Sequence, residues 1–95
     1  MTAPTLHLVQ QSPFTHTALA SCLRVCGPDD GIVLMHDATY AVLGEHDWPT
    51  ARIYALAEDI AERGLSSKTP AAIKLIDYPA LVALCSEHRH SLSWF

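Results

Sequence analysis

Five short apolar runs, spread along 95 residues, constrain this chain more than any other feature. They cover residues 6–9, 32–35, 52–56, 73–76 and 90–94, and each of the first four is followed by a turn or an acidic pair and then by a helix-like stretch. Alternating strand and helix signals indicate a parallel sheet with helices on its faces. We therefore expect an α/β fold with a mainly parallel five-stranded sheet, in a single domain over residues 1–95.

The helix signals between these runs differ in strength. Residues 15–26 carry an apolar stripe and end at Gly27-Pro28, which is typical of a helix that packs against a core and stops at a glycine. Residues 58–63 and 79–87 also show helix patterns, whereas residues 38–43 allow at most a short helix. The second crossover is therefore truncated, so the helices should cover the two sheet faces unevenly. Because parallel sheets are normally buried on both faces, we expect a partner chain to cover the thinner side.

The composition is that of a folded protein with more apolar residues than a domain of this size is expected to bury. Hydrophobic residues make up 49% of the chain and charged residues 17%, which excludes a disordered chain. A domain of this size buries a limited share of its surface, so a subunit interface is one place for the excess. The other interpretation is that much of the excess is alanine, which is harmless on a surface. The net charge of −4 and six scattered lysines and arginines argue against direct nucleic-acid binding.

Targeting signals and cysteine usage indicate a cytoplasmic protein. Residues 1–5 lack the basic start and the apolar segment of an export signal, and no run is long enough to cross a membrane. The three cysteines are an odd number, which favours free thiols over a disulfide framework.

The order of several short motifs along the chain resembles the DsrH/TusB family. The opening Leu6-His7-Leu8 with Ser12-Pro13-Phe14 is similar to the start of that family, and residues 33–37 match its next strand and turn. Residues 53–59, followed by Ala61-Glu62-Arg63-Gly64-Leu65, are similar to its most recognisable block. Residues 76–82 and a late Trp94 complete a resemblance that spans nearly the whole chain.

The resemblance implies a fold, an assembly and a function. The fold is a DsrE-like three-layer α/β/α structure. The assembly is a heterohexamer with DsrE/TusD-like and DsrF/TusC-like subunits, which relays sulfur as a cysteine persulfide between donor and acceptor proteins. The TusBCD type serves 2-thiolation of the tRNA wobble uridine, and the DsrEFH type serves sulfur oxidation. In both types the main sulfur-carrying cysteine belongs to the DsrE or TusD subunit, and this chain has no counterpart of that site.

Cys22 is the candidate catalytic residue, as an auxiliary sulfur acceptor. The resemblance implies this role, because the DsrH type carries a cysteine at that place in the first predicted helix. The residues themselves favour a core cysteine: Cys22 lies on the apolar stripe, in the half of the helix whose dipole opposes an anion. Both interpretations stay open. Cys26 is predicted to have a role in the core or in the capping region at the end of the helix, and Cys85 is predicted to be a core residue.

No metal or cofactor site is expected. The cysteines and histidines lack the paired spacing of a zinc site, and no glycine-rich phosphate loop is present. Asp37, Asp59 and Asp77 each follow a predicted strand, where helix capping explains them without a magnesium ion. His7 and His36 are expected to be structural, the alternative being a pair with Cys22. His46, His88 and His90 are expected to be solvated.

The predicted role is therefore mainly structural, within a sulfur-relay complex. Trp94 and Phe95 are the candidate interface residues, because aromatic side chains are enriched at interface centres. The alternative for Trp94 is packing against the core of its own chain. Two other functions stay open: a sulfurtransferase subunit in which Cys22 carries a persulfide, and a small stand-alone binding module.

Overall fold

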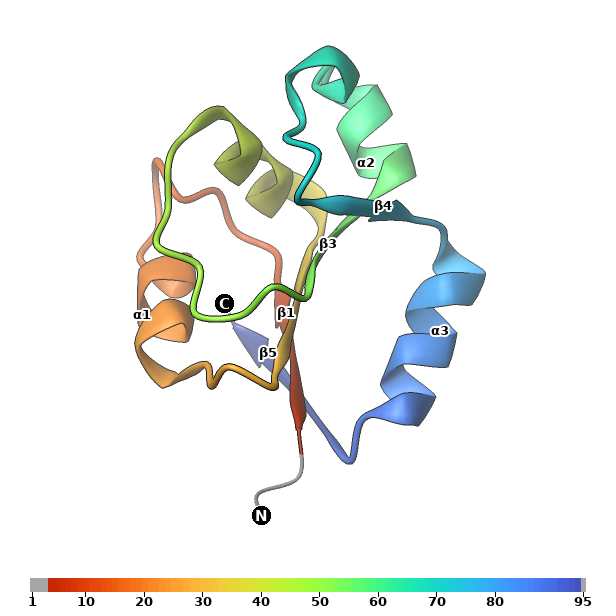
Figure 1. Ribbon diagram of the computed structural model, residues 1–95. Coiled ribbons are helices and arrows are strands. Elements are labelled where there is room, and N and C mark those ends of the chain that lie inside the picture. Colours follow the sequence, from red (N-terminus) through yellow and green to blue (C-terminus); the bar gives the residue numbers. More distant parts are fainter. Residues whose placement is uncertain (1–3, 95) are drawn as a thin grey trace.

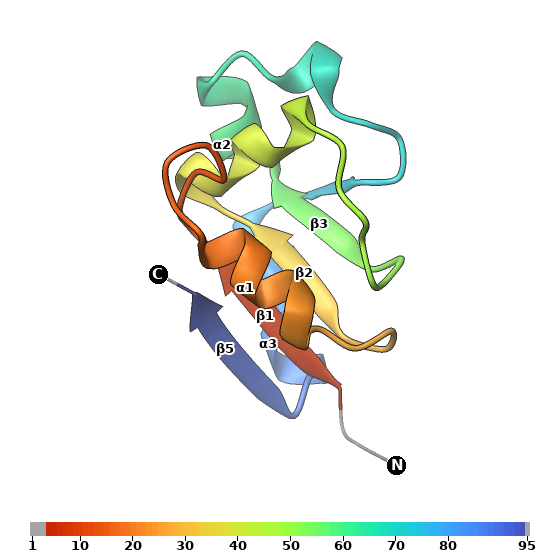
Figure 2. The same ribbon diagram turned by 90° about the vertical axis from the view of Figure 1, so that its left-hand side faces the viewer.

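A computed structural model describes residues 4–94, and within them five strands form one parallel sheet. The strands are β1 (Thr5–Val9), β2 (Gly31–Leu34), β3 (Ile53–Leu56), β4 (Lys74–Ile76) and β5 (His90–Trp94). Their order across the sheet is β4-β3-β2-β1-β5 (Figure 2). All four pairings are parallel, so the predicted fold class is confirmed.

The helices lie on both faces of this sheet and make three layers. They are α1 (Ala18–Val25), α2 (Ala57–Glu62), α3 (Tyr78–Glu87) and the 3₁₀ helices η1 (His36–Leu43) and η2 (Ser66–Lys68). Figure 1 shows the sheet nearly edge-on, with α1 and η1 on one side and α3 on the other. Among the described residues, none of these helices has the length and apolar character of a membrane span. The truncated crossover expected over residues 38–43 is the 3₁₀ helix η1.

The alternation of side chains along the strands sorts the core into two parts. The larger core cluster lies on the side of α1 and η1, and its fully buried members include Leu34, Ala55 and Ile60. The smaller core cluster lies on the side of α3 and contains Leu6 and Val33. Because β2 lies in the middle of the sheet, all of its residues are buried, which explains its uninterrupted apolar run.

The face on the side of α3 is incompletely covered. A single helix crosses from β4 at one edge to β5 at the other, as Figure 1 shows. Leu8, Met35 and Tyr54 pack against the smaller core cluster but remain only half-buried. We name these three residues the open sheet face. The expected uneven coverage is therefore present, but its expected cause is wrong, because the short crossover η1 lies on the side of the larger core cluster and the thinner side is the one that α3 covers alone.

Gly31 at the start of β2 provides a test of how closely the end of α3 packs against the sheet. A Cβ atom at this position would lie 3.0 Å from Leu6 Cδ1 and 3.4 Å from His88 Nε2. We therefore expect Gly31→Ala to lower the free energy of unfolding by about 1–3 kcal/mol, measured by urea unfolding. Gly27→Ala is the control, because its Cβ would meet nothing closer than Asp30 Oδ2 at 3.6 Å. Equal stabilities for the two variants would contradict the close packing of α3 against β2.

Candidate functional site

Cys22, the predicted sulfur acceptor, lies on the inner side of α1 and is fully buried in the larger core cluster. Burial raises the pKa of its thiol to about 12, and negative charge at Cys26 and Asp30 adds to the effect. Burial and then Asp30 likewise raise the pKa of the Cys26 thiol to about 11. Both groups are therefore protonated thiols at neutral pH. This environment suits packing, and sulfur acceptance by Cys22 stays a prediction.

A polar network lies between α1 and the sheet, beside these thiols. Trp94 Nε1 donates a hydrogen bond to His7 Nδ1 at 3.0 Å, and His7 Nε2 lies 3.0 Å from Asp30 Oδ2. Because an indole N–H only donates, Nδ1 of His7 must accept. The proton of the neutral imidazole is therefore on Nε2, which donates to Asp30. The network ties β5 to β1 and β1 to the turn before β2.

Asp30 is the centre of this network. Its Oδ1 accepts the N–H of Thr5 at 2.9 Å, and its Oδ2 accepts the N–H of Gly27 at 2.9 Å. Burial alone would raise the pKa of Asp30, but the hydrogen bonds from Gly27, Thr5 and His7 outweigh it and hold the pKa below its ordinary value. The sequence indicates only a tight turn at residues 29–31. The residues around Asp30 in the sequence do not indicate these hydrogen-bond partners, because Thr5 and His7 are more than 20 positions away.

Acidification is expected to destabilise the protein partly through Asp30. The pKa of Asp30 in the folded protein lies below the ordinary value of 3.8. Its stabilising contribution is therefore complete above about pH 4 and is lost as the pH falls through the folded-state pKa. Urea unfolding measured at about pH 7 and about pH 3 should show a smaller loss for Asp30→Asn than for the parent chain. Identical losses in the two proteins would contradict this assignment.

His7, Cys26 and Asp30 also place three potential metal ligands within 4.8 Å of one another. The hydrogen bond that Trp94 donates to His7 is incompatible with a metal ion bound by these three residues. A metal on Nε2 of His7 would move the ring proton to Nδ1, where it would face the indole N–H with no acceptor between them. The set of donors therefore fits a metal poorly, and a structural network explains all of its contacts.

The carboxyl ends of β2 and β3 bring a second group of polar side chains together. His36 has a φ of 49°, and its N–H donates to Asp59 Oδ2 at 2.7 Å. Arg63 Nη2 lies 3.0 Å from Asp37 Oδ1, and Arg63 Nη1 lies 3.9 Å from Asp59 Oδ1. Negative charge at Asp59 is the main cause that raises the pKa of the nearby Tyr78. These contacts brace the loops that leave the sheet.

The capping expectation holds for one of three aspartates. Asp77 Oδ1 accepts the N–H of Ala80 at 2.9 Å and caps α3. Asp37 and Asp59 do not cap the helices that they open, which corrects the expectation for these two residues. Asp59 instead accepts the free N–H of His36, the first residue of the other helix, η1. Both carboxylates also pair with Arg63, as described above.

The other predicted histidine and cysteine positions differ in how far they are buried. His7 and His36 are structural in their contacts, and each has an aspartate as its closest ionic partner. His90 is exposed as expected, whereas His46 and His88 are half-buried, which corrects the expectation that they are solvated. His46 and His88 are drawn inward because each ring bonds a backbone carbonyl oxygen, that of Ala41 or Leu84. Cys85 packs half-buried against the smaller core cluster.

The candidate interface residues fall at the end of β5. Trp94 is half-buried and packs against the larger core cluster, in addition to its bond with His7. This contact matches the alternative in which Trp94 serves the core of its own chain. Phe95 lies outside the described residues. Contact of either residue with a partner chain stays a prediction.

Comparison with known protein families gives a match that covers most of the chain. The family model described as "DsrH like protein" matches residues 11–91. Protein TusB of Escherichia coli K12 is 35% identical, and the alignment covers 94% of this chain and 99% of that protein. Protein TusB of Yersinia pestis Pestoides F is 30% identical with the same coverage.

Comparison with solved structures gives the same fold. The solution structure of protein Tm0979 from Thermotoga maritima superposes with a TM-score of 0.70 at 27% sequence identity. The superposition covers 86% of this chain and 91% of that one. The likeness therefore extends over nearly the entire α/β/α architecture of both proteins.

Proposed function

This chain belongs to the DsrH family, and from this membership we propose that it is a subunit of a cytoplasmic sulfur-relay complex. The sulfur would serve 2-thiolation of the wobble uridine in tRNA. Similarity over nearly the full length to proteins named TusB supports the tRNA branch over the sulfur-oxidation branch. The partners would be DsrE/TusD-like and DsrF/TusC-like subunits, and the persulfide would be carried by the former.

The proposed role of this subunit is to hold the assembly together. The observation that carries this role is the burial of Cys22, whose thiol is fully enclosed and whose pKa is raised to about 12. Sulfur transfer needs a thiolate that a partner's persulfide can reach, so the burial and the raised pKa of Cys22 support the scaffold role over sulfur acceptance. The alternative, in which Cys22 accepts sulfur, requires α1 to move away from the sheet.

Mass spectrometry of the assembled complex separates the two roles. The chain is co-expressed with its two sister subunits, and the purified complex is incubated with a persulfide donor. We expect a mass gain of one sulfur atom on the DsrE/TusD-like subunit and none on this chain. A nearly stoichiometric gain on Cys22 would overturn the scaffold role. Failure of the three chains to co-purify would overturn the sulfur-relay proposal itself.

The open sheet face is our candidate for the partner contact. Leu8, Met35 and Tyr54 are apolar or aromatic, half-buried and left uncovered beside α3. A parallel sheet with one face partly exposed to solvent gains stability when another chain covers that face. In a three-subunit assembly, a sister subunit is the natural occupant of this surface.

Met35→Lys is expected to weaken association with the sister subunits about tenfold or more. The fold itself should be retained, because the long lysine stem can replace methionine while its ammonium group reaches water. Val25→Lys on α1 is the matched control, since Val25 is 62% exposed on the opposite layer. Titration calorimetry of each variant with the purified sister subunits measures the effect. Equal binding by both variants would exclude the open sheet face as the contact.

A further inference from the structure

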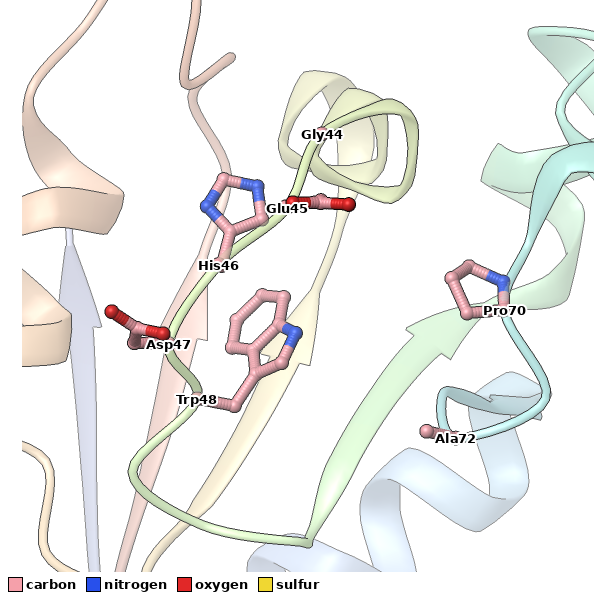
Figure 3. Close-up of a pocket in the computed structure, with 7 residues that line it drawn as sticks. All are labelled: Gly44, Glu45, His46, Asp47, Trp48, Pro70 and Ala72. Atoms are coloured by element: carbon pink, nitrogen blue, oxygen red, sulfur yellow. The ribbon is translucent and has the colours of Figure 1, made fainter.

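A pocket of about 640 Å³ lies between the loop after η1 and the segment before β4. Residues 44–48 form one side of the pocket, and Pro70 and Ala72 form the other (Figure 3). The volume is in the range of pockets that hold a small ligand or a peptide side chain with its neighbours. The lining residues include one histidine, one tryptophan and two acidic residues whose carboxylates point in different directions, and no lysine or arginine.

The aromatic side of the pocket is held in place before any ligand arrives. His46 Nε2 lies 3.0 Å from the carbonyl oxygen of Ala41, which can only accept, so Nε2 donates. The His46 ring packs on the indole of Trp48, with 5.0 Å between ring centroids and an angle of 52° between the planes. Trp48 also packs against the larger core cluster. The indole therefore presents a fixed surface to the pocket.

Two side chains direct their polar groups toward the opening, and one directs its group away. Figure 3 shows the nitrogen-bearing edge of Trp48 and the carboxylate of Glu45 on the side of Pro70. The carboxylate of Asp47 points to the other side of the loop. Within residues 4–94, no ion pair engages Glu45 or Asp47. Glu45 is thus an acidic side chain without an ion-pair partner, and it lines the same pocket as the Trp48 indole.

We propose that this pocket binds an arginine side chain from an extended segment of a partner protein. A guanidinium forms paired hydrogen bonds with a carboxylate, here that of Glu45, and its weakly hydrated surface packs readily beside an aromatic side chain such as Trp48. The methylene stem of arginine would pack on Pro70 and Ala72. Lysine is the poorer match, because its compact, strongly hydrated ammonium cannot form paired hydrogen bonds with a carboxylate in this planar manner. The net charge of −4 favours the approach of a cationic segment.

Nuclear magnetic resonance of the two indole N–H groups tests the proposal on the full chain. The probe is the peptide acetyl-Gly-Arg-Gly-amide, and its neutral isostere with citrulline in place of arginine is the comparison. We expect the Trp48 N–H signal to shift saturably with a Kd of about 1 mM, typical of one anchored side chain. The Trp94 N–H, bonded to His7, should stay in place. The citrulline peptide should bind about tenfold more weakly.

Variants of the two neighbouring carboxylates supply the matched control. Glu45→Gln should weaken arginine binding about tenfold, because it removes the charge on the pocket side. Asp47→Asn removes the same charge from the same loop and should leave binding within about twofold. Both residues are exposed, so both variants should fold as the parent does. Equal weakening by the two variants, equal binding of the arginine and citrulline peptides, or an unmoved Trp48 signal would each overturn the proposal.

Discussion

Asp30→Ala is expected to lower the free energy of unfolding by about 4 kcal/mol. One carboxylate accepts hydrogen bonds from the N–H of Thr5, the N–H of Gly27 and the ring of His7. An unsatisfied buried donor costs about 1–3 kcal/mol, and alanine would leave all three without their acceptor, the buried ring of His7 and the half-buried amides of Thr5 and Gly27. The total is reduced because the Asp30 side chain is 17% exposed, so water can reach part of the site. Urea unfolding followed by circular dichroism measures the loss.

Two further variants make this result specific to the network. Asp29→Ala removes an exposed carboxylate one position earlier and should change the stability by less than about 0.5 kcal/mol. Asp30→Asn keeps one acceptor oxygen and should give an intermediate loss. A loss below about 1 kcal/mol for Asp30→Ala would mean that the three donors find other partners and that Asp30 does not connect these strands.

Cys22 is expected to react with a thiol reagent at least about a thousandfold more slowly than an ordinary exposed cysteine at pH 8. A thiol with a pKa of about 12 holds about a thousandfold less thiolate than one at the ordinary value of 9.0. Complete burial slows the reaction further, because the reagent must wait for a local opening of α1. Iodoacetamide labelling followed by mass spectrometry over time measures the rate.

The chain contains its own reference for this experiment. Cys85 is half-buried on α3 and should be labelled first, and Cys85→Ser should abolish that early phase. In urea above the unfolding transition, all three cysteines should react at similar rates. Native labelling of Cys22 as fast as that of Cys85 would contradict the buried thiol and would strengthen its assignment as a sulfur acceptor.

The sheet could be predicted from the sequence because each strand carries its signal locally. The runs at residues 32–35 and 90–94 correspond to β2 and β5 within one residue at either end. Central strands of a parallel sheet are buried on both faces, so they appear as continuous apolar runs. Gly27 and Asp77 likewise marked a helix end and a helix start through chemistry confined to a few neighbouring residues.

The polar contacts could not be predicted, because they join distant residues. Nothing near Asp30 in the sequence indicates that it binds the amide of Thr5, and a turn aspartate normally bonds within its own turn. Asp59 follows a strand in the manner of a helix cap, yet its carboxylate binds the amide of His36, 23 positions earlier. Cys22 is an intermediate case: its place on the apolar stripe favoured the core, and the structure adds the enclosure that raises its pKa.

The pairing of β5 with β1 has a consequence for how the chain folds. Its side-chain bond from Trp94 to His7 spans 87 positions, and closing so long a loop costs conformational entropy before any contact compensates for it. Proteins dominated by such non-local pairings fold more slowly than those with neighbouring contacts. We expect this strand to dock after the rate-limiting barrier, so that a Trp94→Phe variant would accelerate unfolding and leave the refolding rate nearly unchanged.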